Sequence, residues 1–114
     1  MARKLATATD EETCIEKLAL LFPNASPVRI PVRVTALGSQ RRQLQEQTTI
    51  EFGTAREVLF ASVLPLEFED RVRVANADGS LDADATVIAV RYHGGQKAIA
   101  ARFMREVGNW IIKS

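Results

Sequence analysis

Hydrophobic and polar residues alternate over residues 28–35, with a valine or isoleucine at every second position. A period of two is the spacing of side chains along a β-strand, so this pattern predicts a strand with one buried and one wet face. Pro31 lacks a backbone donor, and it therefore places the strand at a sheet edge or turns that position away from its neighbour.

Five more segments have the alternation, or the β-branched and aromatic content, of strands. Asp78 with Gly79, and Gly94 with Gly95, are typical of the tight turns that join antiparallel strands. Short strands without helical patterns between them predict a mainly β fold, a small six-stranded antiparallel β-barrel over residues 28–104. The further segments are 47–52, 57–63, 71–75, 85–92 and 97–104.

A helical spacing of apolar residues precedes the first strand and predicts one short N-terminal helix at residues 10–22. Thr9 and Glu12 have the spacing of a capping box at its start, and Pro23 ends it. We interpret its hydrophobic stripe as cover for an open end or side of the barrel, in preference to a partner-docking surface. The stripe consists of Ile15, Leu18, Ala19, Leu21 and Phe22.

Composition narrows the class of protein. With 114 residues and no linker or repeat, the sequence predicts a flexible segment at residues 1–9 and a single domain at 10–114. A net charge of +1 argues against a protein drawn to nucleic acid or to a membrane surface. The sequence has no signal-peptide pattern and no apolar run of membrane length, and Cys14 is its only cysteine. We therefore expect a cytoplasmic protein without membrane insertion.

The candidate chemistry is sparse. His93 stands beside a Gly-Gly turn with no nucleophile pattern around it, so we expect no catalytic residues and no enzymatic activity. One cysteine and one histidine exclude the usual zinc site, and Asp82 and Asp84 lack EF-hand spacing, so we expect no metal site. Arg29 and Arg33 share one strand face, roughly 13 Å apart at about 3.3 Å per residue. That spacing suits two sides of a large anion, or simply the wet face of a strand.

The order of elements from Pro27 to the end, about three quarters of the chain, resembles the PilZ domain. PilZ domains are six-stranded barrels of bacterial signalling proteins that commonly bind cyclic di-GMP. The resemblance therefore implies the same barrel and makes cyclic di-GMP the candidate ligand. It is carried by residues 28–34, 47–62, 65–92 and 95–113.

Two motifs of the PilZ family bear on this ligand. An RxxxR motif, whose arginines hold guanine and phosphate, is matched in letters by Arg29 and Arg33, although both lie inside the apparent first strand. In the D/N-x-S-x-x-G motif, Phe52 replaces the first residue, Thr54 the serine and Glu57 the glycine. Glu57 adds bulk and negative charge where a dianionic ligand needs close approach. The resemblance thus implies a degenerate site and leaves Arg29 and Arg33 as its candidate residues.

We therefore expect a non-catalytic PilZ-like signalling or adaptor module that acts through contact with a protein partner and needs no cofactor. One alternative is a genuine cyclic di-GMP receptor that uses Arg29 and Arg33, together with Arg41 or Arg42 near a hairpin tip. A second alternative is a small barrel that binds single-stranded nucleic acid. Its seven aromatic residues and near-zero net charge disfavour that function, because such surfaces combine stacking platforms with a basic groove.

Overall fold

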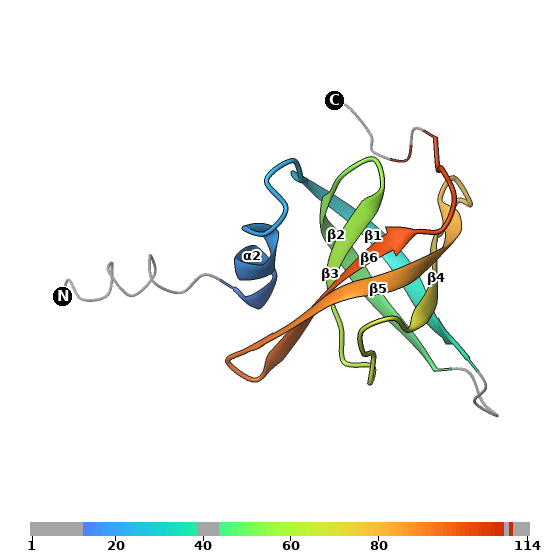
Figure 1. The fold of residues 1–114 in the computed structure, drawn as a ribbon. Coiled ribbons are helices and arrows are strands. Elements are labelled where there is room, and N and C mark those ends of the chain that lie inside the picture. Colours follow the sequence, from blue (N-terminus) through green and yellow to red (C-terminus); the bar gives the residue numbers. More distant parts are fainter. Residues whose placement is uncertain (1–12, 39–43, 109, 111–114) are drawn as a thin grey trace.

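The computed structural model describes residues 13–38, 44–108 and 110. Six strands pair in antiparallel register in the order β1-β2-β3-β6-β5-β4. The sheet closes into a barrel because β1 pairs with β2 on one side and with β4 on the other (Figure 1). The predicted six-stranded antiparallel barrel is confirmed. The strands are β1 Ser26–Leu37, β2 Gln45–Gly53, β3 Glu57–Ala61, β4 Arg71–Asn76, β5 Asp82–His93 and β6 Gln96–Phe103.

The barrel interior is filled by the aliphatic side chains that the period-two pattern assigns to one face. In β1, Ile30, Val32 and Val34 are buried, whereas Arg29 and Arg33 are exposed. Burying one such aliphatic side chain contributes about 1.5–3 kcal/mol, so this single cluster is the main source of stability. The other strands add Ile50, Val58, Phe60, Val72, Val74, Ala85, Val87, Ile99, Ala101 and Phe103.

Chain segments at the two ends of the barrel close its interior. The loop between β3 and β4 inserts Leu64 and Leu66 into the core cluster, and the segment after β6 adds Trp110 to the same cluster. These two segments lie at opposite ends of the barrel (Figure 1). Trp110, in the apolar C-terminal stretch, is thus packed on the barrel.

Glycine determines the turn between β5 and β6. His93 pairs with Gln96, and the two residues between them, Gly94 and Gly95, have φ angles of 61° and 80°. Positive φ at both central positions defines the tight hairpin turn whose twist matches that of the strands. The predicted Gly-Gly hairpin is confirmed.

Pro31 does not lie on an edge strand, because β1 has a partner on both sides. Of the two alternatives predicted for Pro31, the edge strand is therefore wrong, and the position instead has no partner on the β4 side. The pairing of β1 with β4 begins at Val32, opposite Asn76, so Pro31 pairs only with Thr49 of β2. The proline stands one residue outside the second ladder, where a missing donor breaks no hydrogen bond to β4.

The helix α2, Cys14–Ala19, starts later than the capping pattern predicted. Its N-cap is Thr13, whose side chain accepts a hydrogen bond from the Glu16 backbone while the Glu16 carboxylate accepts one from the Thr13 backbone. Thr13 and Glu16 repeat the spacing of Thr9 and Glu12, so the pattern alone did not separate the two starts. Thr9 and Glu12 lie outside the described residues, as does the predicted flexible segment 1–9.

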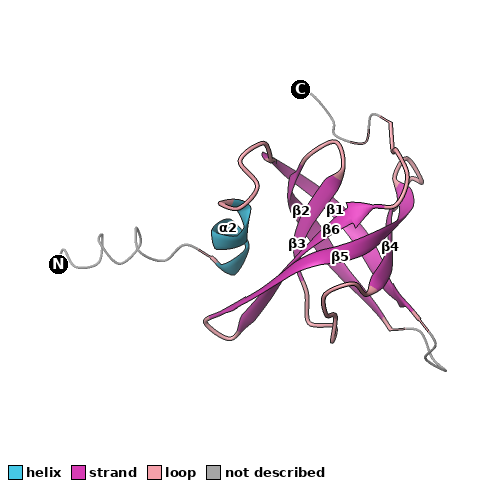
Figure 2. Ribbon diagram, viewed as in Figure 1, coloured by secondary structure: helices cyan, strands magenta, loops and turns pink. Residues whose placement is uncertain are grey.

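The helix covers the outer side of the barrel, where it forms a second hydrophobic cluster (Figure 2). Cys14, Ile15 and Leu18 are buried against outward-facing residues of β3 and β6. The Cys14 thiol also donates to the carbonyl of Arg91, with Sγ 3.1 Å from the oxygen. The interpretation of the stripe as cover for the barrel is thus confirmed, except that Leu21 is 63% exposed. The strand residues under the helix are Leu59, Ala98 and Ala100.

Candidate functional site

The two candidate arginines share an exposed face of β1 but do not share a site. Arg29 lines a shallow depression of about 330 Å³ with Glu16 and Glu51, whereas Arg33 lines another of about 470 Å³ with Gln47. Neither arginine side chain has a hydrogen bond or ion pair within the described residues. The structure therefore brings Arg29 and Arg33 onto one wet face without directing them at a common ligand.

Two carboxylates line the same depression as Arg29. They belong to Glu16 of α2 and Glu51 of β2. A phosphate held by Arg29 would face both carboxylates, and the like-charge repulsion would oppose the attraction to the arginine. Arg41 and Arg42, the further candidates, lie outside the described residues.

The turn between β2 and β3 holds Thr54 and precedes Glu57, two residues that the resemblance set against the D/N-x-S-x-x-G motif, and their side chains bind one another. The Thr54 hydroxyl accepts hydrogen bonds from the backbone of Arg56, at 3.0 Å, and of Glu57, at 2.9 Å. The same hydroxyl donates to the Glu57 carboxylate at 2.7 Å. Thr54 thus fixes the turn, which is a local role that its hydroxyl performs without a ligand.

Glu57 is engaged by a second partner across the sheet. Two guanidinium nitrogens of Arg102 on β6 lie 2.7 and 3.0 Å from one Glu57 carboxylate oxygen. Partial burial raises the pKa of Glu57, but the hydrogen bonds from Thr54 and Arg102 outweigh it, so the pKa lies below its ordinary value of 4.5. The carboxylate is therefore ionised at neutral pH, and its charge is neutralised from within the chain.

Trp110 covers the start of the same turn. Its indole nitrogen donates to the Thr54 carbonyl at 3.1 Å, and its ring packs edge-on against Phe103 with centroids 5.5 Å apart. A Cβ at Gly53 would lie only 2.3 Å from the ring, so the indole rests directly on the Gly53 backbone. Glycine at position 53 leaves room above the backbone, and the Trp110 ring occupies that room.

His93 lies at the exposed tip of the β5–β6 hairpin. No interaction of its side chain occurs within the described residues. The described part of the chain also holds no group of three or more histidine, cysteine, aspartate or glutamate side chains that could bind a metal ion.

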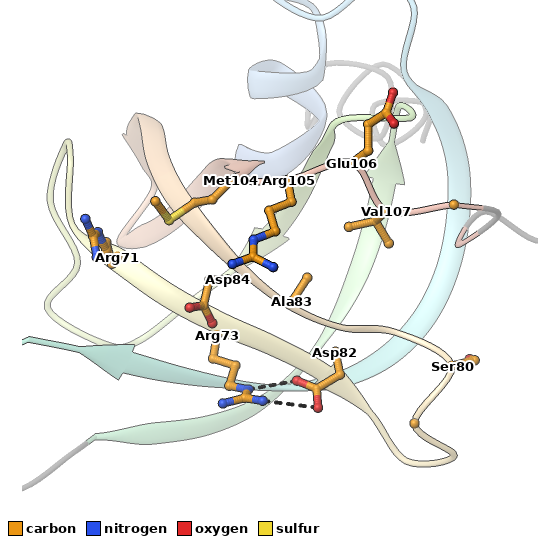
Figure 3. Close-up of a pocket in the computed structure, with 12 residues that line it drawn as sticks. Arg71, Arg73, Ser80, Asp82, Ala83, Asp84, Met104, Arg105, Glu106 and Val107 are labelled. Atoms are coloured by element: carbon orange, nitrogen blue, oxygen red, sulfur yellow. Dashed lines mark hydrogen bonds and ion pairs between the residues drawn. The ribbon is translucent and has the colours of Figure 1, made fainter.

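A groove that the sequence interpretation missed lies over β4 and β5, beside residues 104–108 (Figure 3). It has a volume of about 690 Å³. Arg73 and Asp82 form an ion pair at its floor, with Nε 2.7 Å from Oδ1. Their hydrogen bonds raise the pKa of Arg73 and lower that of Asp82. The remaining charged residues that line it are Arg71, Asp84, Arg105 and Glu106.

The charges of this groove balance, because three arginines meet three carboxylates. Exposed pairs of this kind contribute little to stability, and together they create no field for an anion. The sequence did carry a signal for the groove. Arginines alternate in 71–73 and aspartates in 82–84 on either side of the Asp78-Gly79 turn, which places them on one outer face.

No described helix has the length and apolar character needed to cross a membrane. Comparisons of the chain with models of protein families, with curated proteins and with solved structures find no match.

Proposed function

We propose that this protein is a non-catalytic, cytoplasmic PilZ-like adaptor module whose dinucleotide site is degenerate and which acts through contact with a protein partner. The observation that carries the proposal is the turn between β2 and β3. There Trp110 rests on Gly53, and Glu57 is bound by Thr54 and Arg102. The chain's own residues fill the place that a ligand would need.

Two costs oppose a dinucleotide at this turn. The ligand must displace the indole ring, which loses its hydrogen bond to Thr54 and its packing on Phe103. It must also approach the Glu57 carboxylate, and each phosphate would have to compete for Arg102. Arg29 and Arg33 offer little compensation, since they line separate depressions.

The first test is thermal unfolding with and without cyclic di-GMP. A ligand at about 100 times its dissociation constant adds roughly 2.7 kcal/mol to the free energy of unfolding. For a domain of this size that corresponds to a rise in Tm of at least about 10 °C. We expect no rise, and calorimetry should record no heat beyond dilution.

The receptor alternative makes the opposite prediction. It is favoured by one observation, that both arginines are without a partner in the described residues and could engage a ligand from the β1 face. Tight binding of cyclic di-GMP that Arg29→Ala or Arg33→Ala abolishes would replace the adaptor proposal by the receptor. Arg71→Ala is the matched control, because it removes an exposed arginine from a different face of the barrel.

A further inference from the structure

The first half of β2 has a strand partner on one side only. It pairs with β1 from Gln45 onward, whereas its pairing with β3 starts at Ile50, opposite Phe60. On the side without a strand partner, a side chain bridges the distance to the end of β3. The Thr48 hydroxyl donates to the Ala61 carbonyl at 2.8 Å. The barrel wall is therefore closed by side chains here, in place of a backbone ladder.

Two positions of β2 beside this opening face the barrel interior but carry polar residues. Glu46 pairs with Val34, and Thr48 pairs with Val32. Residues directly opposite each other in an antiparallel pair share one face of the sheet, and both valines are buried in the core cluster. Inward positions of a strand are normally apolar. Departures from such a consistent pattern are expected at functional sites, so the polar pair calls for a physical explanation.

The loop after β3 fixes the Glu46 carboxylate in this opening. One carboxylate oxygen accepts a hydrogen bond from the Ser62 hydroxyl at 2.7 Å, and the other accepts one from the Val63 backbone at 2.9 Å. Both donors are neutral. Glu46 forms no ion pair within the part of the chain that the structure describes. Its side chain is thus held in place, but no cation of these residues neutralises it at contact distance.

Lys97 of β6 supplies the opposite charge. Its ammonium donates to the Leu64 carbonyl and lies 5.8 Å from the centroid of the Tyr92 ring. An ammonium has three protons, so two remain for further acceptors. Lys97 and Glu46 therefore bind neighbouring residues of one loop, yet they form no ion pair with each other. The two fixed charges leave a gap between them.

A groove of about 600 Å³ contains both charged groups. Pockets of about 300–1,000 Å³ are typical of small-molecule sites. Val63 and Tyr92 line this groove and are 87% and 63% exposed, so it also offers uncovered apolar surface. Glu51 adds a second carboxylate to the lining, and a simple anion such as phosphate would be repelled by the two carboxylates.

We propose that this groove binds a free α-amino acid with an apolar side chain. The ammonium group of the ligand pairs with Glu46 and its carboxylate pairs with Lys97, which makes a charge-assisted hydrogen bond at each end. One small molecule that bears both charges fits the gap between the two fixed groups. Its side chain covers Val63 and Tyr92 and removes apolar surface from water. The groove takes no residue from the β2–β3 turn, so this proposal does not depend on the adaptor function.

The test is isothermal titration calorimetry of the full chain with L-leucine and with L-phenylalanine. We expect both to bind. Leucinamide lacks the carboxylate and N-acetyl-leucine lacks the ammonium. Each of them should bind at least tenfold more weakly than leucine, because each loses one charge-assisted hydrogen bond. Glycine should also bind more weakly than leucine, because it has no side chain to cover the apolar lining.

Glu46→Gln and Lys97→Gln each remove one charge and keep a polar side chain. Each should weaken leucine binding at least tenfold. Glu106→Gln and Arg105→Gln are matched controls that should bind leucine as the wild type does, because they remove the same charges from the groove over β4 and β5. If a substitution disturbs the loop after β3, the comparison of leucine with its two singly charged derivatives tests the same pairing on the unmodified protein.

Three results would overturn the proposal. The first is the absence of heat beyond dilution from either amino acid at millimolar concentration. The second is leucine binding that both Glu46→Gln and Lys97→Gln leave unchanged. The third is leucinamide or N-acetyl-leucine binding as tightly as leucine, which would assign the groove to a simple cation or a simple anion.

Discussion

The contact between Gly53 and Trp110 predicts that Gly53→Ala destabilises the wild-type protein but does not destabilise the Trp110→Ala variant. In Gly53→Ala the new Cβ would lie 2.3 Å from Cη2 of the indole, more than 1 Å short of ordinary van der Waals contact. The ring is held by its hydrogen bond to Thr54 and its packing on Phe103. The alanine therefore forces the ring out of its place or shifts the end of β2.

The magnitude follows from the contacts that are lost. Overpacking of this kind costs about 1–3 kcal/mol, and a hydrogen bond given up with it costs about 1 kcal/mol more. We expect Gly53→Ala to lower the free energy of unfolding by about 2–3 kcal/mol in the wild type. Trp110→Ala alone should cost about 3–5 kcal/mol. In that background the clash is absent, and Gly53→Ala should be neutral or stabilising by about 0.5–1 kcal/mol, since glycine weakens a strand.

The assay is urea unfolding of all four proteins, followed by far-ultraviolet circular dichroism. Trp110 is the only tryptophan, so its emission reports separately whether the indole is displaced in Gly53→Ala. A coupling free energy of at least about 2 kcal/mol between the two positions supports the contact. An equal cost of Gly53→Ala in both backgrounds would refute the reasoning.

The triple variant Phe52→Asp, Thr54→Ser, Glu57→Gly should bind cyclic di-GMP more tightly than the wild type in calorimetry, because it gives the turn the residue types of the D/N-x-S-x-x-G motif and replaces Glu57 by a residue that permits close approach to the backbone; equal heats would contradict this. Arg102→Ala should destabilise the protein at neutral pH. The lowered pKa of Glu57 contributes stability that is present above pH 4.5 and lost as the pH falls through the folded-state pKa, so the difference in urea midpoint should shrink in acid. A difference independent of pH would argue against the ion pair. His93→Ala should change the free energy of unfolding by less than about 0.5 kcal/mol in thermal melts, and a larger loss would show a structural role at the hairpin tip.

The strands could be predicted because their signal is local. Alternation in β1 and the glycine turn of β5–β6 depend on neighbouring residues only, and all six predicted strands occur with ends that differ by a few residues. The helix start was ambiguous for the same local reason, since Thr13 and Glu16 repeat the capping pattern of Thr9 and Glu12. The pairing of β1 with β4, which closes the barrel, could not be predicted from local patterns. The role of Pro31 depends on where the β4 ladder begins, which no local pattern states.

The candidate site could be predicted only in part. The period of a strand was sufficient to place Arg29 and Arg33 on one face. The residues beside Arg29 come from α2 and β2 and those beside Arg33 from β2 and β4, so they depend on register and on helix packing. The presence of Glu57 at the glycine position of the D/N-x-S-x-x-G motif was visible in the sequence. Its partner Arg102 and the indole over Gly53 come from segments about 45 to 57 residues away, and their pairing with the turn is a property of the closed barrel.

The separation of the helix cluster from the barrel interior gives the protein two regions that can lose structure independently. Cys14 is 2% exposed beneath α2, and it is the only thiol in the chain. We expect a thiol reagent to reach it when the helix lifts from β6, and we expect the barrel interior to stay packed in that event because Cys14, Ile15 and Leu18 are not members of its core cluster. The rate of thiol labelling therefore measures the free energy of detaching the helix, while the emission of Trp110 follows the barrel. Two native probes, one in each region, distinguish partial from global unfolding without any introduced label.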